Sequence, residues 1–105
     1  MTMEDMGQVV NGLREGKGIY YYKDGDRYEG DFRNGNKEGK GIYYYNTEPW
    51  KGDRYEGEWR NSNKEGKGIY YYNNGDREMC DYSNGKEIGK HVTLSKNGEV
   101  KTNNY

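Results

Sequence analysis

The chain has 105 residues, 33% of them charged, and its 17 Lys and Arg against 18 Asp and Glu give a formal net charge of −1. That balance excludes a global electrostatic attraction to nucleic acid or to an anionic membrane, and the length suits one domain rather than two. Only 30% of the residues are apolar, but 15% are aromatic, including thirteen Tyr. Because disordered segments are poor in aromatic residues, we expect a folded domain whose core consists of aromatic rings.

An exact repeat organises the chain from its first third onward. The octapeptide EGKGIYYY occurs at 15–22, 38–45 and 65–72, at intervals of 23 and 27 residues. The longer interval contains a four-residue insertion in the segment NTEPWKG at 46–52. Without that insertion the period is 23 residues throughout, which is typical of a repeat protein.

A second motif alternates with the octapeptide. YEGDFRNG at 28–35 recurs as YEGEWRNS at 55–62, and weaker copies are DMGQVVNG at 5–12 and EMCDYSNG at 78–85. Atypical units at both ends are expected of a repeat array, because a terminal unit faces water on one side. We therefore predict a single domain, 1–105, composed of a worn unit 5–27, a unit 28–54 with the inserted loop 46–52, a unit 55–77 and a degenerate C-terminal cap 78–105.

The local pattern is that of β-hairpins. Both motifs are short, aromatic and alternating, and they lie between Gly, Asn and Asp clusters. The segments 23–26, 73–76 and 96–99 carry the Asp-Gly or Asn-Gly signal of tight hairpin turns, whereas the connection at 33–39 is predicted to be longer. Frequent glycine and a period of two disfavour helix. The predicted fold is all-β, a single-layer antiparallel meander of tandem hairpins.

Alternation along the strands separates two faces. One face is predicted to carry glycine and aromatic residues with no charged residue, as in Gly18, Tyr20, Tyr28, Gly30 and Phe32. Glycine in a strand often marks the close approach of another group. We therefore expect the rings to lie flat over bare backbone on this face, so that the sheet needs no second layer.

The opposite face is predicted to carry charges in register. Lys17, Lys40, Lys67 and Lys90 form a basic row, and Glu29, Glu56, Asp31, Glu58 and Asp81 form acidic rows beside it. We expect cross-strand pairs, each worth about 0.2–1 kcal/mol. Ile and Tyr residues interleave with the charges, so this face is either a binding surface or ordinary cross-strand packing.

These motifs resemble a known family. The segment YEGEWRNSNKEGKGIYYYNNGDR at 55–77 is similar to the MORN repeat, a Tyr-x-Gly-x-Trp/Phe pattern followed by Gly and Gly-x-Gly, and 28–54 matches it apart from its loop. The resemblance spans residues 5 to 98 approximately. It implies an elongated sheet of successive hairpins that acts in protein–protein interaction or, more contentiously, in binding anionic phospholipids, and it implies no catalytic residue.

Protein recognition is the function that we expect, because Tyr, Trp and Arg are enriched in interface hot spots. Trp50, on the enlarged turn, is either an exposed anchor or folded back over the neighbouring hairpin. A peptide, a helix or a second copy of the chain paired at an edge strand would be the partner. The predicted partner-binding residues are Tyr20, Tyr22, Tyr28, Phe32, Tyr43, Tyr44, Tyr45, Trp50, Tyr55, Trp59, Tyr70 and Tyr72.

The alternative function is weak binding of phosphoinositide or anionic-phospholipid headgroups at a membrane surface. The candidate residues are Lys17, Lys40, Lys67, Arg27, Arg54 and Arg77. Against it, no cluster of four to eight basic residues exists, and Asp26, Asp53 and Asp76 directly precede the arginines. The rows of charged residues are better interpreted as a solvated face.

No apolar run near 18 residues and no signal peptide occur, and the single cysteine fits a reducing compartment. A cytoplasmic location with cytoskeletal or membrane association is therefore expected.

The chain lacks the parts of an enzyme. Cys80 and His91 are the only cysteine and histidine, and their spacing matches no nucleophile or metal-ligand signature. Cys80 is predicted to fill a small slot in the sheet in place of a repeat glycine, and His91 to belong to the terminal cap. We expect no catalytic activity, no cofactor and no metal.

Overall fold

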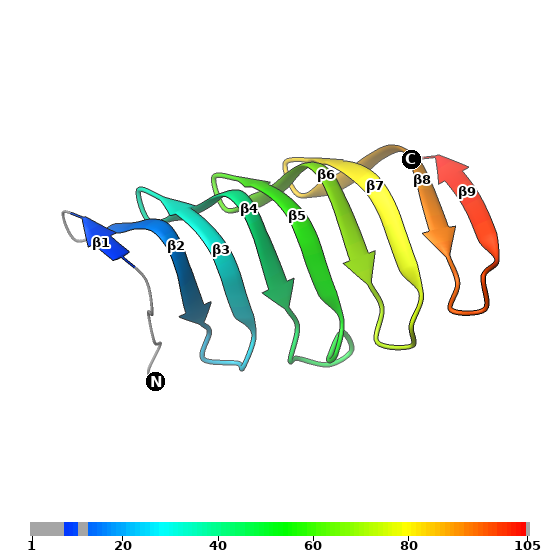
Figure 1. Ribbon diagram of the computed structural model, residues 1–105, viewed down its shortest axis with the longest axis horizontal. Helices are drawn as coiled ribbons and strands as arrows, with labels where there is room; N and C mark the ends of the chain where they lie inside the picture. Colours follow the sequence, from blue (N-terminus) through cyan, green and yellow to red (C-terminus); the bar gives the residue numbers. More distant parts are fainter. Residues whose placement is uncertain (1–7, 11–12, 105) are drawn as a thin grey trace.

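The computed structural model of the protein describes residues 8–10 and 13–104, with side chains over 15–102. Its strands are β1 (Gln8–Val10), β2 (Leu13–Tyr21), β3 (Arg27–Arg33), β4 (Asn36–Tyr44), β5 (Arg54–Arg60), β6 (Asn63–Tyr71), β7 (Arg77–Ser83), β8 (Lys86–Leu94) and β9 (Val100–Asn104). Each strand pairs antiparallel with the next in sequence order, giving one open sheet (Figure 1).

The molecule is an elongated single layer. Its principal extents are 47 × 24 × 17 Å, and the hairpins follow one another along the longest axis (Figure 1). The described part of the chain contains strands and turns and no helix, so it also contains no helix long and apolar enough to cross a membrane. The predicted all-β meander of tandem hairpins is confirmed.

The tightest turns lie where the longest connection was predicted. Asn34 and Gly35 form a two-residue turn with φ of 51° and 82°, the positive values that a type I′ hairpin requires. The prediction of a long 33–39 connection was wrong because β4 already begins at Asn36. In the equivalent turn Ser62 takes the glycine position with φ of 66°, and its Oγ accepts a hydrogen bond from the Lys37 N–H at 3.1 Å.

The Asp-Gly segment 23–26 forms a wider loop than predicted. The Tyr22 N–H donates to the Asp26 carbonyl at 2.9 Å, and the Gly25 N–H donates to the Tyr22 carbonyl at 3.0 Å. Gly25 has φ of 103°, so the loop is a β-turn closed by a glycine bulge. An Asn-Gly or Asp-Gly dipeptide fits both turn types, and only the strand pairing decides between them.

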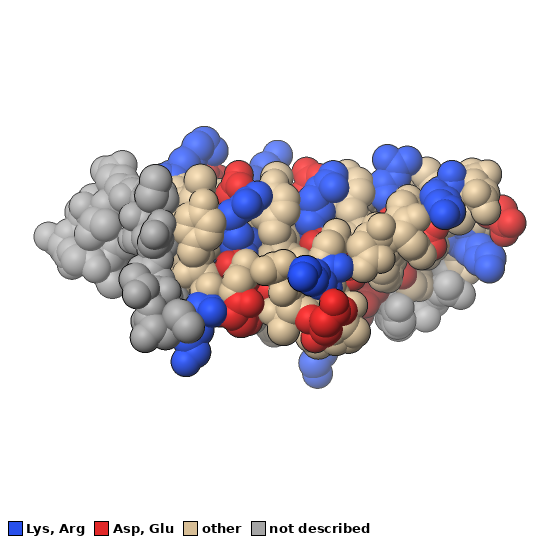
Figure 2. Space-filling view, turned by 90° about the horizontal axis from the view of Figure 1, so that it is seen from below, with Lys and Arg blue, Asp and Glu red and all other residues tan. Residues whose placement is uncertain are grey.

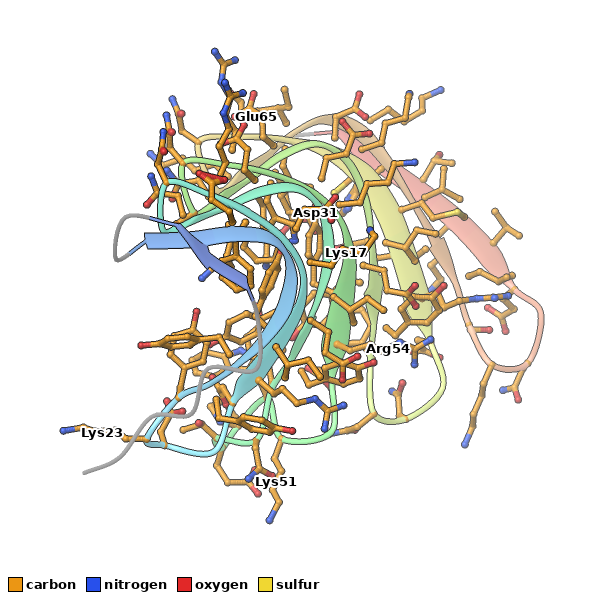
Figure 3. The ribbon with its side chains drawn as sticks, turned by 60° about the vertical axis from the view of Figure 1, so that its left-hand side comes forward. Lys17, Lys23, Asp31, Lys51, Arg54 and Glu65 are labelled. Atoms are coloured by element: carbon orange, nitrogen blue, oxygen red, sulfur yellow. The ribbon has the colours of Figure 1, made fainter. Side chains whose placement is uncertain are left out.

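A bulge bends each hairpin. Residues 38–40 stand opposite Asp31 alone, and Gly39 has φ of 85°; the same shift recurs between β5 and β6 and between β7 and β8. Because bulges bend and twist strands, the sheet forms an arc in cross-section (Figure 3). We call the side that carries the buried Tyr28 ring the inner face and the side that carries Lys17 the outer face.

The core is a line of aromatic rings on the inner face. Tyr28 and Tyr55 have no exposed surface, and a methyl group built on Gly41 would overlap the Tyr28 ring and hydroxyl. Successive rings meet nearly edge to face with centroids 5.1–5.4 Å apart, the geometry that aromatic pairs prefer. The line runs through Phe32, Tyr28, Trp59, Tyr55 and Tyr82. Rings over bare backbone thus form the core, as predicted from the glycine spacing.

Replacing Gly41 with alanine is expected to lower the free energy of unfolding by about 2 kcal/mol or more. The added methyl group would overlap the buried Tyr28 ring, which has no room to move away. Urea unfolding followed by far-ultraviolet circular dichroism measures the effect. Lys40→Ala, one residue away and exposed on the outer face, is the control and should change the free energy of unfolding by about 0.5 kcal/mol at most. Equal stability of the two variants would contradict the packing argument.

Candidate functional site

The outer face carries three cross-strand rows of side chains. In the central row isoleucine alternates with glutamate, because Ile19 pairs with Glu29, Glu29 with Ile42 and Ile42 with Glu56. On one side lies a row in which tyrosine alternates with arginine, and on the other a row in which lysine alternates with aspartate or glutamate. The alternation follows from the register, which places the same residue types of every repeat opposite one another.

Most charges of the outer face are neutralised within these rows. The Arg27 guanidinium lies 4.0 Å from the centre of the Tyr44 ring and 2.8 Å from the Glu29 carboxylate. Arg54 repeats this arrangement over Tyr71 and beside Glu56. Two of the expected Lys–Asp pairs form across strands, Lys17–Asp31 at 3.0 Å and Lys67–Asp81 at 4.0 Å. Basic and acidic atoms accordingly intersperse along the molecule (Figure 2).

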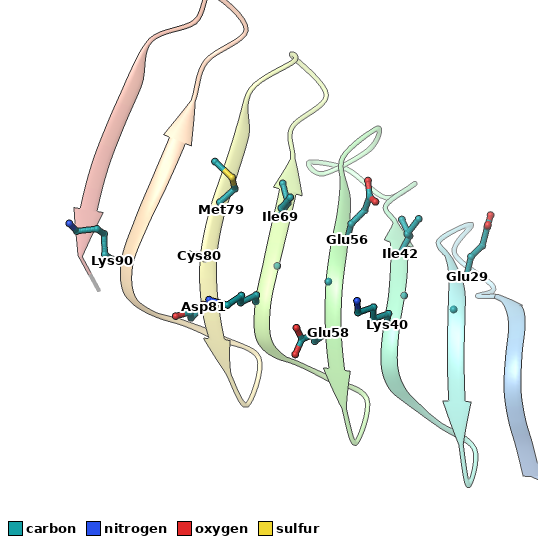
Figure 4. A pocket seen from close by; sticks show the side chains of 15 residues that line it. Glu29, Lys40, Ile42, Glu56, Glu58, Ile69, Met79, Cys80, Asp81 and Lys90 are labelled. Atoms are coloured by element: carbon teal, nitrogen blue, oxygen red, sulfur yellow. Dashed lines mark ion pairs between the residues drawn. The ribbon is translucent and has the colours of Figure 1, made fainter.

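A shallow groove of about 820 Å³ crosses the strands of the outer face. Its floor is backbone at the paired glycines, between the rows of outward-pointing side chains. One wall is the row in which Ile42 and Ile69 alternate with glutamates and which ends at Met79; the other contains charged residues such as Lys40 and Glu58 (Figure 4). We call this feature the outer groove.

The C-terminal end of the outer groove departs from the repeat. Met79 stands where the other units have Glu29 and Glu56, and it pairs with Ile69 on one side and Val92 on the other. The Met79 side chain is 39% exposed. The alternation of isoleucine and glutamate therefore gives way here to a continuous apolar row.

Four of the twelve predicted partner-binding residues are structural. Tyr28 and Tyr55 are 0% exposed, and Phe32 and Trp59 are 6% exposed, so a partner cannot reach them while the sheet is folded. A fifth, Tyr44, lies on the outer face beneath Arg27. The largest of the twelve predicted rings therefore fill the core.

The remaining predicted rings form a second row above the core. Neighbouring centroids are 4.8–5.7 Å apart, along Tyr20, Tyr22, Tyr43, Tyr45, Tyr70 and Tyr72. Trp50 joins this row with its ring 6.4 Å from that of Tyr45, yet it remains 51% exposed. Both alternatives for Trp50 therefore hold in part, since it leans on a neighbouring tyrosine and still presents a face to water.

A hollow of about 400 Å³ opens beside this row on the inner face. Four predicted residues line it, namely Tyr45, Trp50, Tyr70 and Tyr72. Acidic side chains from the last unit, Glu78 and Glu87, also line it. We call it the inner hollow.

Two lysines occupy the inner face, where no charged residue was predicted. The Lys37 ammonium lies within 5.2–5.6 Å of four ring centroids and donates a hydrogen bond to the Tyr22 hydroxyl at 2.6 Å. Lys64 repeats this arrangement and donates to the Tyr45 hydroxyl at 3.1 Å. Burial lowers the pKa of both ammonium groups. Strand alternation could have found them, since Lys37 is an even number of residues from Gly41.

The aspartates that precede the arginines connect neighbouring hairpins. Asp26, only 6% exposed, accepts hydrogen bonds from the Tyr43 hydroxyl at 2.8 Å and from the Asn46 N–H at 2.7 Å. Asp53 accepts the same pair from Tyr70 and Asn73. The carboxylates that pair directly with the arginine side chains are Glu29 and Glu56.

Cys80 and His91 both lie beside Glu87, although their spacing matched no motif. Cys80 is 7% exposed and fills its slot in the sheet as predicted. His91 is 3% exposed and its Nδ1 lies 2.6 Å from a Glu78 carboxylate oxygen. His91 lies in β8, within the segment 78–105 predicted to be the C-terminal cap, and β9 pairs with β8 beyond it. The register shift between β7 and β8 adjoins this position.

Comparison with known families places three tandem matches to the MORN repeat on the chain, at residues 6–27, 28–47 and 55–77. Together the matched ranges cover more than half of the 105 residues. The second match ends within the inserted loop, and the third contains β5 and β6. A search of curated proteins gives no match.

The buried phenols predict a loss of stability in alkali. Burial raises the pKa of Tyr45 to about 12 from 10.0, and it also raises the pKa of Tyr28, Tyr43, Tyr55, Tyr70 and Tyr82. Above about pH 10 an unfolded tyrosine releases its proton while these remain protonated in the fold. Their contribution to stability is therefore complete below pH 10 and is lost as the pH rises toward their native pKa values.

Parallel titrations of tyrosinate absorbance and of the far-ultraviolet circular dichroism signal check this. We expect the tyrosinate absorbance of these six of the thirteen tyrosines to appear together with loss of the β signal. Ionisation of all the tyrosines near pH 10 with an unchanged β signal would show that the six phenols are accessible in the folded protein.

Proposed function

Because the chain belongs to the MORN-repeat family, we propose that it is a non-catalytic module that binds an amphipathic segment of a partner protein along the outer groove. The family is associated with protein or membrane-lipid interactions. The observation that carries the proposal is the replacement of the repeat glutamate by the 39% exposed Met79 at the apolar end of the groove.

The shape of the outer groove suits a polypeptide segment. Its volume of about 820 Å³ lies within the range of about 300–1,000 Å³ typical of ligand sites. The outer groove is open to solvent rather than enclosed, and it runs along the array across several strands (Figure 4). Such a site accepts a linear segment better than a compact metabolite.

The chemistry of the two walls defines the partner segment. Ile69 and Met79 offer apolar surface on one wall, and Lys40, Glu58 and Lys67 offer charges of both signs on the other. A matching segment has apolar side chains along one side and both acidic and basic side chains along the other. The apolar contacts would supply the affinity, and the charges would set the register of the segment.

The inner hollow is a second, smaller docking surface of the same class. It combines the 51% exposed Trp50 with Tyr72, which is 38% exposed, and tryptophan and tyrosine are typical hot-spot residues. A partner that reaches around the inserted loop would contact the inner hollow.

We also propose a cytoplasmic location, because a lone thiol at Cys80 fits a reducing compartment.

Met79→Glu tests the outer groove. The substitution restores the residue that Glu29 and Glu56 provide in the other units, so the variant should fold while its groove loses the apolar end. In affinity capture from a lysate of the source cells, quantified by mass spectrometry, we expect specific partners of the parent to fall by about tenfold or more, equivalent to about 1.4 kcal/mol.

Trp50→Ala is the matched control on the inner face, and it should retain the partners that Met79→Glu loses. Loss with Trp50→Ala and retention with Met79→Glu would assign binding to the inner hollow instead. Equal recovery with the parent and both variants would reject both surfaces. Light scattering of the parent shows whether a second copy occupies the groove.

Lipid binding is the alternative function, and the ion pairs of the outer face argue against it. Arg27, Arg54, Lys17 and Lys67 each lie beside a carboxylate, which cancels much of their attraction for an anionic headgroup. We expect no salt-sensitive sedimentation with liposomes containing phosphoinositide, compared with neutral liposomes. Sedimentation that is lost on adding salt and in an Arg27→Gln, Arg54→Gln variant would favour the lipid function.

A further inference from the structure

The last repeat differs from the regular units at four adjoining positions of the inner face. The regular units have a tyrosine ring over two glycines, with a lysine ammonium above the ring, as in Tyr55, Gly57, Gly68 and Lys64. Twenty-three residues further on, all four are replaced by side chains with metal-ligand atoms. The replacements are Glu78, Cys80, His91 and Glu87, respectively.

The fold brings these four side chains together from two paired strands. Glu78 and Cys80 alternate on β7, and Glu87 and His91 lie on β8. The carboxylate and thiol donor atoms of Glu78, Cys80 and Glu87 lie within 4.8 Å of one another. The His91 Nδ1 is 2.6 Å from Glu78 Oε2 and 3.6 Å from Glu87 Oε2, and the Cys80 Sγ is 3.6 Å from Glu87 Oε2.

Two of these separations are close to the edges of a metal tetrahedron. With metal–ligand bonds of about 2.0–2.3 Å, neighbouring donor atoms of a tetrahedral site lie about 3.3–3.6 Å apart. Two of the contacts already have this length, at 3.6 Å. The shorter Glu78–His91 contact is a hydrogen bond, in which a metal ion would take the place of the Nδ1 proton.

Most of the cluster is buried, since His91, Glu78 and Cys80 are 3%, 7% and 7% exposed. Free carboxylates and a free thiolate are costly to hold in such a dry site, and a bound divalent cation would offset that cost.

We propose that Glu78, Cys80, Glu87 and His91 form a four-ligand site for a divalent cation of the zinc class. An imidazole nitrogen, a thiolate and two carboxylates are all zinc ligands, and a closed four-protein-ligand set is that of a structural site. Binding releases the thiol proton and the Nδ1 proton of the imidazole. The ion reaches the site through the inner hollow, which Glu78 and Glu87 line.

The metal would replace the aromatic core at the end of the array. The core line of rings ends at Tyr82, and Thr93 stands where the other units have Tyr43 and Tyr70. A metal that joins β7 to β8 supplies the cross-strand link that stacked rings supply elsewhere. This role is independent of the outer groove, since its ligands lie on the inner face.

Metal titration of the full chain, purified without a histidine tag, reduced and stripped with a chelator, tests the site. Zinc affinity is measured by competition with a chromophoric chelator, and cobalt(II) reports the ligand set through its absorption spectrum. We expect one equivalent of metal to bind, a thiolate-to-cobalt charge-transfer band, and a higher melting temperature of the parent with zinc.

Two variants test whether these side chains are the metal ligands. Cys80→Ser preserves the shape of the site and should abolish the charge-transfer band and weaken zinc binding by at least about tenfold. The triple variant Glu78→Tyr, Cys80→Gly, His91→Gly restores the tyrosine and the two glycines of the regular unit, so it should fold, and it should lose zinc binding. Binding by the parent no tighter than by the triple variant would overturn the proposal and leave Glu78–His91 as an ion pair only. An unchanged affinity and spectrum in Cys80→Ser would also overturn it.

Discussion

The contact between a tyrosine ring and a glycine backbone is the constraint on which the rest of this structure depends. A sheet with one layer has no partner against which to bury its side chains, and most small domains solve this with a second layer. Here Tyr28 and Tyr55 lie along the sheet instead, over glycines whose absent side chains make room for them. Each ring also contacts rings from the neighbouring units, so the core continues from hairpin to hairpin without a second layer.

The two faces of the sheet therefore carry different side chains. On the inner face the largest rings form the core, and the ammonium groups of Lys37 and Lys64 lie among them. The outer face carries the isoleucine–glutamate row and the lysine row, and the outer groove runs between them over the glycine backbone. The repeat sets the length of the outer groove, and single departures such as Met79 set its chemistry.

The C-terminal unit lacks this contact between a tyrosine ring and a glycine backbone. Glu78 replaces the tyrosine, and the buried Cys80 and His91 replace the two glycines. The imidazole of His91 then lies within hydrogen-bonding distance of the Glu78 carboxylate. Polar side chains are thus buried in the core where the sequence departs from the repeat. The remaining units keep their aromatic core and their strand register.

The repeated spacing of glycine and tyrosine by itself determined the strands, their order, the inner face and its ring-over-backbone core, because alternation and a fixed period leave few other arrangements. It did not determine which turns are tight, since Asn-Gly and Asp-Gly fit more than one loop, or that Asp26 links hairpins, since its partner Tyr43 belongs to another strand. The approach of Cys80 and His91 to Glu87 was likewise decided only by the tertiary structure. Such contacts depend on register and bulges, which arise when two strands pair and which neither strand specifies alone.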